Sequence, residues 1–315
     1  MPSYWQLLLL ILPVFVVIAL GAGARTVGWL TEEADSSLLR LVVNLLYPCL
    51  IIDNVLGNAS LRDPANVILA PLVGYVTMAF GIIASLYAGR LLGLERGKGL
   101  RTFAYAAGIY NYGYIPIPLM TALFGQESIG VLLVHNVGCE AAIWTVGIIV
   151  LSGGSLREGW RKLLNPPLVA LIVALLGNAL QLNDHLPQWI RTVVSTVGAC
   201  AIPLGLLLIG GTLMEYLTRP SQLFAPRVTP GACLVRLVLL PAAFLLLAWA
   251  LPAPTELKRV ILVQAAMPAG ILPIVIAKHY GGHPLIAVQV VIGTTAVGLL
   301  VIPWWLGIGM SWILP

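Results

Sequence analysis

Long apolar runs recur along the whole 315-residue chain, separated by short stretches that carry most of the charged and turn-forming residues. A helix that crosses the hydrocarbon core of a bilayer needs about 20 apolar residues. Charged residues make up only 9% of the chain, whereas soluble domains contain roughly 25%. The sequence therefore predicts an all-α integral membrane protein with little room for a soluble domain.

The positions of these runs predict ten membrane spans. We place the spans at 5–24, 38–57, 67–92, 102–124, 129–152, 167–182, 193–214, 232–251, 258–280 and 285–306. If both termini lie outside the cytoplasm, most Lys and Arg residues fall in cytoplasmic connections. The positive-inside rule therefore favours this orientation. Arg236 is one of the residues assigned to a cytoplasmic connection. We expect a multi-pass protein of a plasma or bacterial inner membrane. The scattered basic residues form no basic face, so no nucleic-acid partner is expected.

Two halves of five spans would enter the membrane with opposite orientations, as in an inverted repeat. The expected units are a first repeat at 1–152, a short cytoplasmic connection at 153–166 and a second repeat at 167–315. Proline spacing supports this division, because each proline disturbs its helix and two triplets have nearly equal spacing. These triplets are Pro13, Pro48 and Pro118, and Pro167, Pro203 and Pro273.

Two mid-span segments, 111–118 and 264–273, each combine two prolines with glycine, which predicts broken helices in spans 4 and 9. Irregular backbone at membrane depth is tolerated where it is buried in protein or lines a wet cavity. The amino ends of the distal half-helices would suit a carboxylate. The alternative is simple kinking, with Asn111 and Gln264 satisfying freed backbone groups. The predicted substrate-site residues are Asn111, Tyr112, Gly113, Ile115, Pro116, Pro118, Gln264, Met267, Pro268, Ala269 and Pro273.

Glu140 lies near the middle of span 5, where a charged side chain costs about 2.5–3.5 kcal/mol and therefore requires a partner, a proton or an ion. Asn136 lies one turn away on the same helix face. Two hypotheses stay open for this pair: a Na⁺ or H⁺ coupling site, or a protonated carboxyl that forms a hydrogen bond between helices. No catalytic motif, cofactor motif or metal-ligand spacing is present, so we expect neither an enzyme nor a metal site.

Several segments resemble the auxin efflux carrier family, which includes plant auxin exporters and bacterial permeases for malate-like acids. The similarity is strongest in Gln264-Ala-Ala-Met-Pro-Ala-Gly-Ile-Leu-Pro273 and continues to Tyr280. It extends to Leu41-Val-Val-Asn-Leu-Leu-Tyr-Pro48, Asn165-Pro-Pro-Leu-Val-Ala170 and Ile202-Pro-Leu-Gly205. The likeness runs nearly from end to end.

The resemblance implies a scaffold of spans 1, 2, 6 and 7 and a transport domain of spans 3–5 and 8–10 that moves like an elevator, in a homodimer. By motif position, Asn111, Pro118 and Pro273 would lie at the crossing of the broken helices and receive a substrate carboxylate. The fold would resemble that of bile acid:sodium symporters and sodium–proton antiporters, and cation sites near spans 4, 5 and 9 of that symporter fold point to Glu140. Pro116 departs from the family pattern, because many relatives have glycine there.

The expected function is that of a secondary carrier that exports or exchanges a small organic anion, either an auxin-like or a malate-like carboxylate. One alternative is a sodium- or proton-coupled symporter that uses Glu140. Another is a membrane receptor that binds such a ligand without transporting it. The expected partners are the anion, the lipid bilayer and a second copy of the chain.

Overall fold

The computed structural model describes residues 2–152, 164–217 and 223–314, and every element in these ranges is a helix. The prediction of an all-α chain is confirmed. Most of the expected connection 153–166 lies outside the described residues.

Seven described helices are long and apolar enough to cross a bilayer. They are α1 (Tyr4–Thr26), α2–η1–α3 (Glu32–Val55), α4 (Pro64–Leu91), α7–η3–α8 (Gln126–Ser152), α11–α12 (Gln188–Leu217), α13–η6–α14 (Val228–Ala250) and α17 (Pro284–Ile313). Three of them contain a π-helical segment, namely η1 (Val42–Leu46), η3 (Ile143–Gly147) and η6 (Val235–Leu239). Two 3₁₀ turns, η2 (Ala59–Arg62) and η4 (Leu182–His185), lie in connections.

The remaining apolar helices are shorter. They comprise α10 (Pro166–Ala179) and two pairs of half-helices: α5 (Leu100–Gly108) with α6 (Pro116–Phe124), and α15 (Thr255–Ala266) with α16 (Leu272–His279). Within each pair the backbone leaves the helical conformation for several residues. These two interruptions lie at the segments 111–118 and 264–273 that the sequence singled out.

Helix boundaries differ from the apolar runs where polar residues stabilise a helix end. The second long helix begins at Glu32, six residues before the expected start at 38, because Glu32, Glu33 and Asp35 occupy its first turn. Acidic side chains are favourable there, since the amino end of a helix carries partial positive charge. Hydropathy alone places such residues outside the helix.

Corresponding prolines of the two triplets occupy equivalent positions in the helices in only some cases. Pro118 and Pro273 both lie in the first turn of a half-helix that follows an interruption. Pro13 instead lies within the continuous α1, whereas Pro167 is the second residue of the short helix α10. The expected equivalence of this first pair is therefore wrong, because a proline at the start of a helix removes no intrahelical hydrogen bond.

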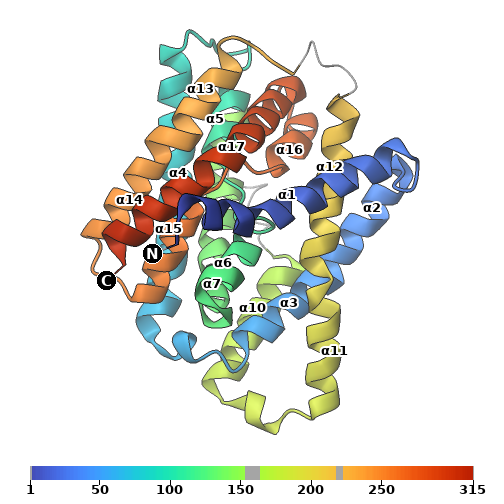
Figure 1. The fold of residues 1–315 in the computed structure, drawn as a ribbon, viewed down its shortest axis with the longest axis vertical. Coiled ribbons are helices and arrows are strands. Elements are labelled where there is room, and N and C mark those ends of the chain that lie inside the picture. The colour runs from blue at the N-terminus through green and yellow to red at the C-terminus, as the bar shows by residue number, and fades with distance from the viewer. Residues whose placement is uncertain (1, 153–163, 218–222, 315) are drawn as a thin grey trace.

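Helix contacts fall into two groups (Figure 1). In the first group, α4 contacts α5 and α7, while α17 contacts α5, α13, α15 and α16. In the second group, α1 runs along α12, and α3 contacts both α10 and α11. The groups meet where α1 contacts α17 and α3 contacts α7.

Glycines allow the closest helix approaches in both groups. A Cβ atom at Gly21 or Gly210 would collide with the facing backbone between α1 and α12, and one at Gly74 or Gly138 would do so between α4 and α7. Small residues at helix contacts are typical of membrane proteins, because they let backbones approach closely. These contacts hold the two pairs of long helices together.

Large apolar side chains also cover the outer faces of the long helices. Examples exposed by more than half are Leu9, Leu20, Ile68, Leu72, Val76, Leu246 and Leu300. Such a surface is unfavourable in water and suits contact with lipid.

Arg236 is the clearest departure from the expected topology. It was assigned to a cytoplasmic connection, but it lies inside the helix Val228–Ala250 and is fully buried, with 0% of its surface exposed. Its guanidinium lies over the rings of Tyr110 and Phe244. Phe244 lies further along the same helix, whereas Tyr110 lies on another segment, so local hydropathy gave no sign of the contact with Tyr110.

Candidate functional site

The two helix interruptions pair with each other through their backbones. Tyr110 and Ala269 form an antiparallel bridge. The Asn111 N–H donates to the Pro268 carbonyl oxygen at 2.8 Å, and the Gly270 N–H donates to the Ile109 carbonyl oxygen at 2.9 Å. Three residues of each interruption, 109–111 and 268–270, therefore lie side by side, although they are far apart in the sequence.

Proline chemistry explains where the second interruption begins. The residue before a proline disfavours the helical region, because the proline ring clashes with its backbone. Met267 precedes Pro268 and has an extended backbone (φ −72°, ψ 141°), so α15 ends at Ala266. The chain becomes helical again at Leu272, with Pro273 in the first turn, where a missing N–H has little cost.

The first turn of α6 has few free donors. The Ile115 N–H donates to Asn111 Oδ1 at 3.3 Å, and the Ile117 N–H donates to the Gly113 carbonyl oxygen at 3.1 Å. Pro116 and Pro118 have no N–H group. Asn111 thus stabilises the start of α6, which agrees with the simpler of its two expected roles.

Free backbone donors lie in the unwound residues themselves and at the first residue of α16. Within the described chain, five N–H groups at the interruptions make no hydrogen bond; they belong to Tyr112, Gly113, Tyr114, Ile271 and Leu272. Backbone groups away from water almost always have partners. Five unpaired donors beside two half-helix amino ends are an arrangement that can bind an anion.

A cluster of amide side chains fixes the unwound backbone at Tyr112. Asn136 Nδ2 donates to the Tyr112 carbonyl oxygen at 2.8 Å, and Gln264 Nε2 donates to the same oxygen at 3.1 Å. Gln264 Nε2 also lies 3.2 Å from Asn136 Oδ1, which accepts. The cluster connects the first interruption with α7 and α15, so a movement of either helix would shift the unwound backbone at Tyr112.

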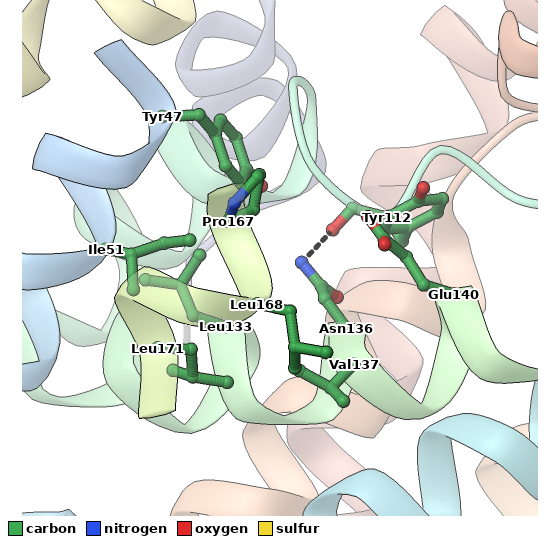
Figure 2. A pocket seen from close by; sticks show the side chains of 10 residues that line it. All are labelled: Tyr47, Ile51, Tyr112, Leu133, Asn136, Val137, Glu140, Pro167, Leu168 and Leu171. Carbon is green, nitrogen blue, oxygen red and sulfur yellow. Dashed lines mark hydrogen bonds between the residues drawn. The ribbon is translucent and has the colours of Figure 1, made fainter. Parts of the chain in front are cut away.

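A pocket opens beside this cluster, between the two helix groups (Figure 2). Its volume is about 40 Å³, enough for a few water molecules or a small cation but not for an organic acid. In this conformation the pocket is therefore too closed to hold the expected substrate. It is lined by Tyr47, Ile51, Tyr112, Leu133, Asn136, Val137, Glu140, Pro167, Leu168 and Leu171.

Glu140 has a partner across the pocket. Asn165 Nδ2 donates to Glu140 Oε2 at 2.9 Å, and Asn165 Oδ1 accepts from the Leu168 N–H at 2.9 Å as the amino-terminal cap of α10. The sequence indicated that this carboxyl needed a partner. The asparagine was missed, because it lies at the end of the expected connection, as the amino-terminal cap of another helix.

The predicted site residues have different places in the structure. Tyr112, Asn136 and Glu140 line the pocket, and Gln264 belongs to the amide cluster. The others lie in the interruptions or in the first turns of the half-helices; they are Asn111, Gly113, Ile115, Pro116, Pro118, Met267, Pro268, Ala269 and Pro273.

Sequence reasoning missed the apolar lining from α3, α7 and α10, which includes Ile51, Leu133 and Leu171. These side chains look like any other residues of an apolar helix. Only Pro167 carried a signal, through the spacing of the proline triplets.

Seven long apolar helices with lipid-suited outer faces, with two paired helix interruptions buried among them, are the features of a multi-pass membrane protein. A sequence profile of the family described as membrane transport protein matches residues 7–159 and 156–306. The chain therefore belongs to this family of transporters, the auxin efflux carrier family.

The relatives found include archaeal and plant proteins. The chain is 27% identical to an uncharacterized transporter of Methanothermobacter thermautotrophicus, covering 94% of this chain and 96% of that protein. It is 23% identical to an uncharacterized transporter of Methanocaldococcus jannaschii, covering 96% and 97%. It is 32% identical to auxin efflux carrier component 3 of Arabidopsis thaliana, but that match covers 40% of this chain and 20% of the plant protein.

Proposed function

We propose that this chain is a secondary carrier that exports or exchanges a small organic anion by alternating access. The observation that carries the proposal is the pairing of two interrupted helices, buried in the protein, with five free backbone donors beside it. A carboxylate could accept hydrogen bonds from these donors without direct contact with a basic side chain. Membership of a transporter family supports movement of the ligand rather than binding alone.

The proposed substrate is an auxin-like or malate-like carboxylate. The plant relatives are named auxin efflux carriers, whereas the two archaeal relatives carry no assigned substrate. Aromatic and aliphatic side chains line most of the pocket, which suits the apolar part of an indole acid. Malate would leave more polar groups unpaired in the same surroundings, so we place the indole acid first.

The proposed architecture has ten spans in two inverted repeats, counting α10 and the two interrupted pairs with the seven long helices. The group of α1, α3, α10, α11 and α12 would be the scaffold, and the group of α4–α8 and α13–α17 would be the transport domain that moves like an elevator. The pocket between the groups supports this division, because motion there would open and close it. We further propose a homodimer in a cell membrane with both termini outside the cytoplasm.

Counterflow in proteoliposomes tests the carrier proposal. Vesicles are loaded with unlabelled indole-3-acetate or malate, and entry of the labelled acid is followed. A carrier gives transient accumulation above equilibrium. A receptor gives only saturable, stoichiometric binding, which would contradict the proposal.

Gln264→Leu is the variant that should lose counterflow, and Gln188→Leu is its matched control. Gln264→Leu removes both amide hydrogen bonds to the cluster, so the Tyr112 carbonyl loses one donor. We expect counterflow to fall by about tenfold or more, since a buried acceptor is left with fewer partners. Gln188→Leu, at an exposed helix start, should leave counterflow unchanged.

A second candidate function is symport coupled to Na⁺ or H⁺. It rests on the pocket itself, whose volume of about 40 Å³ fits an ion and whose lining includes Glu140 and Asn136. Glu140→Gln keeps an acceptor for Asn165 but removes the charge. In a coupled carrier this variant should keep counterflow and lose accumulation driven by a Na⁺ or pH gradient. If wild-type flux ignores both gradients and the membrane potential, coupling is excluded.

A further inference from the structure

The buried charge of Arg236 has no role in the candidate site described above. The Arg236 guanidinium carbon lies 5.3 Å from the ring centroid of Tyr110 and 5.4 Å from that of Phe244. Its Nη2 donates to the Ala265 carbonyl oxygen at 3.4 Å. Since Tyr110 belongs to one interruption and Ala265 lies in the last turn of the helix before the other, the charge lies at the depth of the paired breaks.

The chain supplies no counter-charge for this arginine among its described residues. There, no carboxylate oxygen lies within 4.0 Å of the guanidinium, and its Nε and Nη1 have no hydrogen-bond partner. By contrast, Arg259 pairs with Glu256 at 2.6 Å. An uncompensated charge inside a membrane protein is strongly unfavourable. Its presence calls for a negative partner from elsewhere.

Local contacts offset only part of this charge. Aromatic faces attract a guanidinium weakly. Ala265 belongs to the last turn of α15, whose carboxyl end carries partial negative charge. A purely structural role as a cap for α15 would need one neutral donor and would not need a permanent charge.

We propose that Arg236 is the fixed counter-charge of the anion site, a positioning residue that makes the paired breaks prefer an ionised acid over its neutral analogue. Arg236 does not line the pocket, so it acts through the electrostatic field and not by contact. Coulomb attraction is stronger in a low-dielectric interior than in water. This inference rests on the proposed function, since it assigns a charge preference to the same site.

Paired ligands measure this preference directly. Binding of indole-3-acetate and of indole-3-acetamide is measured on purified wild-type protein, and the ratio of the two affinities is the readout. Arg236→Gln keeps a donor for the Ala265 carbonyl but removes the charge, whereas Arg236→Lys keeps the charge. If Arg236→Gln does not fold, Arg236→Met takes its place, because an apolar chain of similar length removes the buried charge altogether.

We expect wild type and Arg236→Lys to prefer the acid, and we expect the uncharged variant to lose about tenfold of that preference. An unchanged ratio in the uncharged variant would overturn the assignment of Arg236. If all variants bind both ligands more weakly by the same factor, the assignment would also be overturned, since that result indicates a structural role for Arg236. A wild-type protein that binds neither ligand would instead contradict the indole acid as the substrate of the proposed carrier.

Discussion

Asn165 joins two features that the sequence presents separately. Its side-chain oxygen caps α10, while its side-chain nitrogen donates to Glu140 on α7. In the proposed division of helices, this is a contact between the scaffold and the transport domain. The two roles differ chemically. The helix cap needs a hydrogen-bond acceptor, whereas Glu140 needs a donor on a side chain long enough to contact it.

Substitutions at Asn165 separate these roles. Asn165→Ser keeps a good helix cap but lacks the amide that reaches Glu140, whereas Asn165→Ala loses both. We expect Asn165→Ala to be less stable than Asn165→Ser by about 1 kcal/mol, the usual contribution of a cap. Thermal unfolding in detergent measures this difference, and equal stability of the two variants would show that the cap contributes nothing.

Residue-level prediction from sequence succeeded where a local rule applied. A carboxyl in mid-span requires a partner, so Glu140 could be singled out from hydropathy alone. Arg236 could not, because it lies a few residues from the end of an apolar run and resembles a residue of a connection. Its burial depends on Phe244, further along the same helix, and on Tyr110, which only tertiary structure brings to it.

At the scale of elements, the interrupted helices were predictable because proline and glycine act on their own backbone. The pairing of the interruptions was not, since it depends on hydrogen bonds between segments more than 150 residues apart. The positions of the free donors were not predictable either. Pro116 and Pro118 remove donors from the first turn of α6, so the free N–H groups lie in the unwound residues before it.

Thr294 of α17 supports the second interruption. Its hydroxyl oxygen accepts from the Ala269 N–H at 3.1 Å and donates its proton to the Val290 carbonyl oxygen at 2.8 Å. Thr294→Val keeps the shape but leaves the buried Ala269 donor unpaired, which should lower stability by about 1–3 kcal/mol and reduce counterflow. Thr294→Ser keeps the hydroxyl and is the control. A valine variant as stable and active as the serine variant would show that this hydrogen bond is dispensable.

At the scale of the whole molecule, alternating access requires the two helix groups to move relative to each other. Two similar side-chain contacts allow a comparison. Lys278 of α16 lies over the ring of Tyr216 of α12, 5.6 Å from its centroid, and so connects the groups. Arg259 of α15 lies over the ring of Phe124 of α6 at 5.2 Å, within one group.

Crosslinking these pairs tests the motion. Cysteine pairs replace each contact in a background without the four native cysteines, and a short reducible crosslinker joins them. We expect the 216–278 link to stop counterflow until it is reduced, and the 124–259 link to leave counterflow intact. Undiminished counterflow across a complete 216–278 link would contradict relative motion of the groups.

The central claim is that the unwound backbone of the paired interruptions binds a carboxylate. A structure determined with a brominated indole acid, located by the anomalous signal of bromine, tests it most directly. The account predicts the acid between the two helix groups, with its carboxylate within hydrogen-bond distance of N–H groups in the segments 112–114 and 271–272. A carboxylate bound away from both segments would contradict it.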